Sequence, residues 1–170
     1  MKNLRPDIYK KNVFSIDYNS LKKKGIKVLL FDFDNTIIVK GKYSVDDKMI
    51  KLFKSLKKDF IVYILTNSIH IRKINMISKQ LDTSYIKGAR KPFKAGFKKL
   101  EKKLNKVKSN QIAMIGDQLM TDVLGGKKMG YLTILIDPIN NDELLFTKIN
   151  RLIEKREFKK NNIKRGEYYG

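Results

Sequence analysis

The sequence contains no cysteine and no tryptophan, and only 3 of its 170 residues are proline. The lack of cysteine excludes disulfides and thiolate metal sites. The longest apolar runs, Val28–Phe31 and Ile61–Leu65, fall far short of the roughly 20 residues that cross a bilayer. The first residues also lack the apolar stretch that is typical of a signal peptide. We therefore expect a cytoplasmic protein that folds around one compact core.

Acidic residues are scarce, because 17 Asp and Glu stand against 38 Lys and Arg and leave a formal net charge of +21. The excess is uneven, and residues 87–108 alone carry +9. A positive field of this size attracts phosphates, nucleic acid or anionic lipid headgroups. Lysine enrichment beside abundant Asn and Ile is also what an AT-rich genome produces. The charge alone therefore does not establish a nucleic-acid partner.

Short β-branched apolar runs alternate with longer amphipathic segments between residues 26 and 138. The runs that we predict as strands are Ile26–Phe33, Phe60–Leu65, Ser84–Ile86, Gln111–Ile115 and Tyr131–Ile136. The predicted helices are Val45–Lys58, Ile69–Gln80, Phe93–Leu104 and Leu119–Met129. Strands that are short and apolar on both faces are typical of a buried parallel sheet with right-handed crossovers. The sequence thus predicts an α/β protein, a three-layer α/β/α Rossmann-like fold around a five-stranded parallel sheet.

Two flanks lie outside this alternation. For residues 1–25 we predict an irregular arm that ends in the segment Leu21–Lys24. The segment Glu143–Lys155 has apolar residues at helical spacing and predicts a helix over the sheet edge. We expect residues 1–155 to form the single domain. Residues 156–170 have almost nothing to bury and predict a basic, mobile C-terminal tail.

Polar residues of related chemistry follow the predicted strands. In chain order they are Asp32 and Asp34, then Thr66 and Asn67, then Lys91, then Asp117 and Asp122. Ligands of open parallel sheets bind at the carboxyl ends of strands, so we expect these side chains to converge. Neighbouring carboxylates need a cation, and Mg²⁺ prefers carboxylates, water and phosphate. The hydroxyl, amide and lysine suit phosphoryl transfer, in which donors must face the phosphate oxygens.

Each of these residues has an ordinary structural explanation when it is taken singly. Asp-x-Asp occurs in turns, and a threonine after a strand is often a helix N-cap. Only the joint order of these residues along the chain favours an active site.

Other residues that could be functional have simpler structural explanations. His70 is expected to be structural or exposed, and the four-residue spacing of Phe93 and Phe97 favours core packing over base stacking. The pair Gly125–Gly126 indicates close packing of a helix on a strand rather than a phosphate loop.

Four segments together resemble the motifs of the haloacid-dehalogenase-like (HAD) phosphatases: Asp32-Phe33-Asp34-Asn35-Thr36, Thr66-Asn67, Lys91-Pro92 and Gly116-Asp117-Gln118-Leu119-Met120-Thr121-Asp122. The last of them, with Leu4-Arg5-Pro6-Asp7 and Gly25-Ile26-Lys27, is similar to the YqeG-type subgroup of subfamily IIIA. That subgroup is similar to phosphatidylglycerophosphatases. The resemblance covers roughly residues 4–155 and implies a HAD-like fold.

The resemblance also implies a role for each matching residue. Asp32 would be the nucleophile that forms an aspartyl-phosphate. Asp34 would protonate the leaving group and then deprotonate the hydrolytic water. Thr66 and the backbone of Asn67 would bind phosphate oxygens, and Lys91 would offset charge on the nucleophile and the phosphoryl group.

A magnesium site is implied by the same resemblance. Its ligands would be the side chains of Asp32 and Asp117 and the backbone carbonyl of Asp34. Asp122 would support the site or contact the metal directly.

The motif spacing leaves no room for a large cap domain, since 34 residues separate Asp32 from Thr66 and 25 separate Thr66 from Lys91. An open site favours a large or surface-bound substrate. The basic segment 87–108 suits a phosphate on an anionic membrane, where each Lys or Arg contributes about 1 kcal/mol. Our leading hypothesis is a phosphatase of phosphatidylglycerophosphate or a similar lipid, peripheral on the inner face of the membrane. Two alternatives are a phosphatase of nucleotides, sugar phosphates or nucleic-acid ends, and a basic protein that binds RNA or a ribonucleoprotein.

Overall fold

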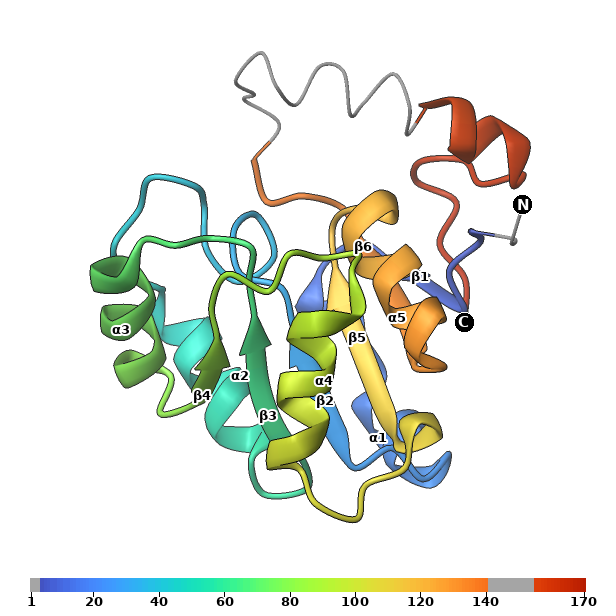
Figure 1. Cartoon of the computed structure of the whole chain (residues 1–170). Coiled ribbons are helices and arrows are strands. Elements are labelled where there is room, and N and C mark those ends of the chain that lie inside the picture. The colour runs from blue at the N-terminus through green and yellow to red at the C-terminus, as the bar shows by residue number, and fades with distance from the viewer. Residues whose placement is uncertain (1–3, 141–154) are drawn as a thin grey trace.

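The computed structural model describes residues 4–140 and 155–170 (Figure 1). Six parallel strands form one sheet in the order β1-β6-β5-β2-β3-β4. The strands are β1 (Ile8–Lys10), β2 (Val28–Phe31), β3 (Ile61–Leu65), β4 (Ser84–Ile86), β5 (Ile112–Gly116) and β6 (Leu132–Ile136). Because all the strands run the same way, their carboxyl ends meet at a single edge of the sheet.

Helices cover both faces of the sheet and confirm the predicted three layers (Figure 1). One face carries α1 (Tyr18–Lys23), α2 (Asp47–Leu56) and α3 (Ile71–Gln80), and the other carries α4 (Lys94–Lys103) and α5 (Leu124–Met129). Strand β2 is buried on both sides, since Leu29 and Phe31 pack into the first layer while Val28 and Leu30 pack into the second. This alternation explains why the strand reads as an uninterrupted apolar run.

The sheet has one strand more than the five predicted. The extra strand, β1, lies in the segment 1–25 that was expected to be irregular, and it pairs with β6 through Ile8 opposite Ile134. Three residues are too few to show a strand periodicity in the sequence. Asp7, just before this strand, adds side-chain bonds to the pairing, because its carboxylate accepts hydrogen bonds from the backbone N–H and the hydroxyl of Thr133 at 2.8 and 2.6 Å.

Replacing Asp7 with Ala is expected to lower the free energy of unfolding by about 1–3 kcal/mol, because the buried polar groups of Thr133 then lose their acceptor. Partial burial raises the pKa of Asp7, but the bonds from Thr133 and the Lys127 ammonium outweigh it and hold the pKa below its ordinary value. Urea denaturation at neutral pH measures the change. The control is Asp59→Ala, which removes an exposed ion pair worth about 1 kcal/mol or less. Equal losses in the two variants would contradict the role of Asp7.

The C-terminal segment packs against β1, the strand at the side edge of the sheet. The sequence instead predicts a mobile tail with little to bury. Residues 155–160 are helical. Phe158 and Ile163 are buried in a cluster with Tyr9, and the backbones of Tyr9 and Tyr169 exchange two hydrogen bonds of 2.9 Å. A few apolar residues without regular spacing suffice for this contact, so no sequence pattern predicts it. The predicted helix Glu143–Lys155 lies, except for its last residue, outside the described residues.

Helix α4 begins one residue later than predicted. Of the two aromatic side chains predicted in it, only one lies in the helix and in the core. Phe97 is fully buried, as expected, but Phe93 precedes the helix and is 67% exposed. Core packing is therefore the wrong prediction for Phe93. The packing predicted for Gly125–Gly126 is present, since a Cβ on Gly126 would lie 2.8 Å from the Thr133 methyl and 3.1 Å from Met114 Cβ.

The connections at the carboxyl edge contain no cap domain. Residues 32–46 join β2 to α2, residues 66–70 join β3 to α3, and residues 87–93 join β4 to α4. Among the described residues, the connections that follow β2, β3 and β4 at this edge are thus loops. Within residues 4–140 and 155–170, every helix is too short or too polar to span a membrane.

Candidate active site

Three neighbouring strands deliver the predicted site residues to one edge of the sheet. Strand β2 lies between β5 and β3, so Asp32 at its end lies between Asp117, which follows β5, and Thr66, which follows β3. The backbone N–H of Asp32 donates to the carbonyl of Ile115 at 2.8 Å, which extends the pairing into the site. Lys91 arrives from the loop after β4. The structure therefore brings together residues that are far apart in the sequence.

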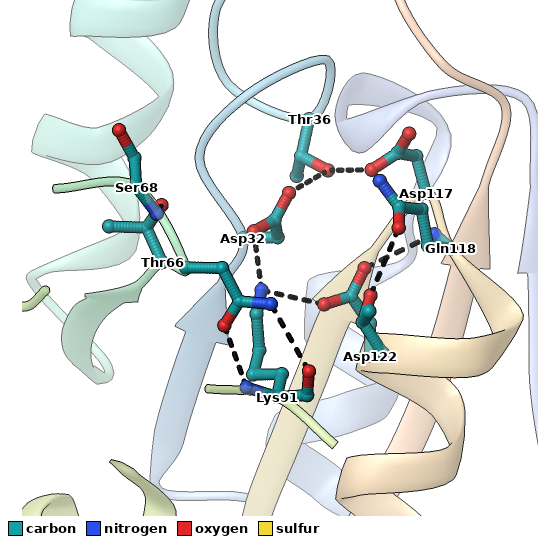
Figure 2. Close-up of polar contacts among 10 residues, drawn as sticks. Asp32, Thr36, Thr66, Ser68, Lys91, Asp117, Gln118 and Asp122 are labelled. Atoms are coloured by element: carbon teal, nitrogen blue, oxygen red, sulfur yellow. Dashed lines mark hydrogen bonds and ion pairs between the residues drawn. The ribbon is translucent and has the colours of Figure 1, made fainter. Parts of the chain in front are cut away.

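Lys91 joins two carboxylates at the centre of this site (Figure 2). Its ammonium contacts Asp32 Oδ1 and lies 2.7 Å from Asp122 Oδ1, and its side chain is only 2% exposed. Burial lowers the pKa of Lys91, but the carboxylates of Asp122 and Asp32 more than offset this effect and raise the pKa. Lys91 is therefore a fixed cation beside the predicted nucleophile.

A third carboxylate completes a buried acidic group. Oxygen atoms of Asp32, Asp117 and Asp122 all lie within 4.8 Å of one another. The Thr36 hydroxyl lies between two of them, 3.4 Å from Asp32 Oδ2 and 3.3 Å from Asp117 Oδ1. Burial raises the pKa of Asp32 to about 6 against the effect of Lys91. Burial, with Asp32 and Asp122 as neighbours, raises the pKa of Asp117 well above its ordinary value.

The charges in this group fit a divalent cation. Three carboxylates and one ammonium leave a formal charge of minus two in a buried site, which is costly without a further cation. Carboxylate oxygens are the protein ligands that Mg²⁺ prefers, and it needs only one or two of them. Asp32 and Asp117 have oxygens on the Thr36 side, away from Lys91, and these could hold the ion.

Asp122 is placed to position Lys91 rather than to act as a main metal ligand. One of its oxygens contacts Lys91, and the other accepts a hydrogen bond from the backbone N–H of Gln118 at 3.1 Å. The residue lies in a π-helical turn, Leu119–Val123, of a kind often found at functional sites. Both of its oxygens are thus engaged within the protein.

Asp34 is not part of this carboxylate group and pairs with a different lysine. Its side chain is 30% exposed, and Oδ1 lies 2.7 Å from the ammonium of Lys73 on α3. Asn35 follows with a left-handed φ of 62°, which turns the chain sharply after Asp34. Lys73 is buried, and sequence analysis missed it. The available signal was a lysine four residues before Ile77, on the apolar face of the helix.

The side chain of Asn67 clamps the backbone of Lys91, a role that the sequence did not reveal. Its Oδ1 accepts from the Lys91 N–H at 2.7 Å, and its Nδ2 donates to the Lys91 carbonyl at 3.1 Å. Thr66 Oγ1 accepts from the N–H of Ser68 at 3.0 Å, which leaves its own proton able to donate to a phosphate. The two residues therefore position Lys91 and offer a donor beside Asp32.

Gly116 lets Asp122 approach the end of β5. A Cβ at this position would lie 2.3 Å from the Asp122 carboxylate, so Gly116→Ala must displace that side chain. Because displacements of about 1 Å can cost 10²-fold in rate, we expect Gly116→Ala to lower phosphatase turnover by about 10–100-fold. Steady-state rates and thermal melting measure both consequences. The control Gly126→Ala crowds Thr133 instead and is expected to lower the melting temperature without lowering the rate of the folded protein. A Gly116→Ala enzyme with normal turnover would contradict the requirement for Asp122 in its observed position.

The fold is that of the HAD class. The structure is similar to the HAD hydrolase YfnB of Bacillus subtilis, which was solved with bound magnesium. The TM-score is 0.59 over 72% of this chain and 92% of that one, at 15% identity. It is also similar to a HAD phosphatase from Thermococcus onnurineus, with a TM-score of 0.57 over 75% and 98% of the two chains, at 16% identity. At these identities the likeness concerns the fold alone.

The family model described as "Mitochondrial PGP phosphatase" matches residues 1–140, and the chain belongs to this family. It is 32% identical over 151 residues to the "Probable phosphatase YqeG" of Bacillus subtilis, covering 89% of this chain and 87% of that protein. It is 24% identical over 147 residues to a phosphatidylglycerophosphate phosphatase of Arabidopsis thaliana, covering 81% of this chain but only 42% of the plant protein. These likenesses confirm the predicted family and a phosphatase activity.

Proposed function

We propose that the protein is a Mg²⁺-dependent phosphatase in which Asp32 forms a covalent phosphoryl intermediate. The observation that carries this proposal is the ion pair of buried Lys91 with Asp32, beside the carboxylate of Asp117. Asp32, Asp117 and the backbone carbonyl of Asp34 would hold Mg²⁺, which when bound neutralises charge on the phosphate and the carboxylates. The chain itself supplies the nucleophile, the fixed cation and the proton donor.

In the first step, an Asp32 oxygen attacks phosphorus while the bond from phosphorus to the leaving oxygen breaks. The electrons of that bond go to the leaving oxygen, which takes a proton from Asp34. Lys91 offsets the charge that spreads over the phosphoryl oxygens, and Thr66 donates to one of them. In the second step, water attacks the same phosphorus, gives a proton to Asp34 and releases the Asp32 carboxylate together with inorganic phosphate.

The ion pair between Asp34 and Lys73 bears on this cycle. The Asp34 carboxyl that is to act on the leaving oxygen is held by the Lys73 ammonium at 2.7 Å. A phosphate dianion that enters the site offers Lys73 another partner and frees the Asp34 carboxyl from this contact. We therefore expect the pair to separate when substrate binds.

Asp34→Asn is expected to slow hydrolysis of alkyl phosphates by about 10²-fold or more, because the alkoxide then leaves without a proton. Hydrolysis of p-nitrophenyl phosphate should suffer much less in its first step, since nitrophenolate leaves without protonation. The ratio of single-turnover rates on the two substrates measures this difference. Full activity on alkyl phosphates, or an equal loss on both, would end the acid–base assignment.

The substrate that we propose is phosphatidylglycerophosphate or a similar phosphate displayed on a surface. Support comes from the described connections beside the site residues, which are loops without a cap, and from Lys87, Arg90 and Lys94 in and beside the Lys91 loop. A small soluble substrate would find few walls here to bury it. The family match and the activity named for the plant relative point to the same lipid.

The test is Mg²⁺-dependent phosphate release from a panel of substrates, with Asp32→Asn as the inactive control. The panel contains phosphatidylglycerophosphate in mixed micelles, nucleoside monophosphates, sugar phosphates and a 3′-phosphorylated oligonucleotide. We expect the lipid to be preferred. Preference for a soluble phosphate would keep the mechanism and refute the lipid substrate, and no release from any substrate would refute the proposed function.

A further inference from the structure

Exposed large apolar side chains gather at the edge of the sheet that carries the site. Nine such side chains occur in residues 4–140 and 155–170. Six of them follow the carboxyl ends of strands: Phe14 after β1, Tyr43 after β2, Ile69 and Ile71 after β3, Phe93 after β4 and Ile139 after β6. Single exposed apolar residues are ordinary, but a concentration of them marks an interaction surface.

The two most exposed of the nine lie on the loops that carry site residues. Ile69 is 74% exposed and comes three residues after Thr66, while Phe93 is 67% exposed and comes two residues after Lys91. Both loops lie just beyond the arrowhead of β3 in Figure 1. They therefore adjoin the site residues Thr66 and Lys91 along the chain.

These two loops are bound to each other and form one surface. The N–H of Ala89 donates to the carbonyl of Thr66 at 2.9 Å, and that of Gly88 donates to the carbonyl of Ser68 at 3.2 Å. Ile69 lies over Gly88, where a Cβ would come within 3.9 Å of its Cγ2. We call residues 66–72 and 87–94 the docking face.

The charged side chains of the docking face are all basic. It contains no Asp or Glu, and its exposed basic side chains are Arg72, Lys87, Arg90 and Lys94. The ammonium of Lys128 adds a further cation 5.9 Å from the ring of Phe93. Near an anionic membrane each such residue strengthens binding by about fivefold.

We propose that the docking face binds an anionic lipid bilayer, with Ile69 and Phe93 inserted among the headgroups and the basic residues on lipid phosphates. The inference rests on the proposed function, because it explains how an open site meets a phosphate on a membrane. Ile69, the most exposed of these side chains, is aliphatic and suits a bilayer better than nucleic acid, whose bases stack on aromatic rings. The uniform positive charge complements an anionic lipid surface more simply than it does a protein partner.

The test is co-sedimentation of the full chain with vesicles of phosphatidylcholine, with and without phosphatidylglycerol. Wild type and Asp32→Asn should bind the anionic vesicles equally, since docking precedes chemistry. Ile69→Ser/Phe93→Ser should bind about tenfold more weakly or worse. The control Ile61→Ser removes an exposed apolar side chain at the opposite end of β3 and should bind like wild type.

A second pair of variants tests the charge independently of the apolar contacts. Lys87→Gln/Lys94→Gln should weaken binding to anionic vesicles by about tenfold or more, whereas Lys102→Gln/Lys103→Gln, at the far end of α4, should not. Melting temperatures and turnover of soluble p-nitrophenyl phosphate report whether each variant keeps its fold and site.

The outcomes separate the docking face from the proposed function. Normal vesicle binding by both docking-face variants, equal loss in the matched controls, or no binding by wild type would each overturn the docking face. None of these results affects hydrolysis of the lipid in detergent micelles, which tests the function. Vesicle binding that depends on the docking face, in a protein that releases no phosphate from the lipid in micelles, would uphold the docking face and refute the substrate.

Discussion

Asp32→Asn is expected to lower the turnover of any phosphate monoester by about 10⁴-fold or more, because loss of a nucleophile removes the covalent route altogether. An amide of the same size is a far weaker nucleophile than a carboxylate. The oxygen of that amide could still accept a hydrogen bond from Lys91, so the fold should persist. Phosphate release at saturating Mg²⁺, together with thermal melting, measures both expectations.

The matched control for this variant is Asp46→Asn. Asp46 caps α2 by accepting a hydrogen bond from the N–H of Met49 at 2.8 Å, and Asn caps helices equally well. This control should therefore keep both activity and stability. Reduction with borohydride during turnover should label the acyl phosphate of the wild type and leave Asp32→Asn unlabelled. Substantial turnover by Asp32→Asn, or equal labelling of both proteins, would refute Asp32 as the nucleophile.

The parts of the site that the sequence predicts are those that the backbone topology dictates. Once parallel strands are recognised from their apolar runs, their carboxyl ends must share an edge, and residues that follow them must converge. That logic places Asp32, Thr66, Lys91 and Asp117 together, and the structure does so. This prediction from strand topology requires no knowledge of any side-chain contact.

The parts that the sequence does not predict depend on contacts between distant segments. Strand β1 is too short to show a period and is recognised only by its pairing with β6. The clamp of Asn67 on the Lys91 backbone and the ion pair of Lys73 with Asp34 each join segments at least 24 residues apart. Phe93 is exposed because α4 starts one residue after it, and helix boundaries are the least certain feature of a sequence pattern.

Lys91→Met should affect stability as strongly as catalysis. Removing one partner of a buried ion pair typically costs about 3–5 kcal/mol, and here two carboxylates lose their partner at once. We expect a loss of that size in urea denaturation of the metal-free protein. The matched control Lys73→Met also removes a buried lysine, but its partner Asp34 is partly exposed, so the loss should be smaller.

The loss caused by Lys91→Met should depend on pH. Burial raises the pKa of Asp32 to about 6 and raises the pKa of Asp117 as well, so the folded protein binds these protons more tightly than the unfolded chain. The stability of the metal-free protein must therefore fall as pH rises through about 6. Without Lys91 the carboxylates repel one another more strongly, so the variant should lose more stability above this pH than below it.

A double variant separates the charge of Lys91 from its packing. In Lys91→Met/Asp122→Asn the site regains its formal charge of minus two, so the double variant should be more stable than Lys91→Met alone despite carrying one more substitution. The interaction free energy of the double-mutant cycle then measures the coupling between these two residues. Additive losses, with no dependence on pH, would mean that Lys91 stabilises the fold by packing alone, and its role as the fixed cation beside Asp32 would have to be abandoned.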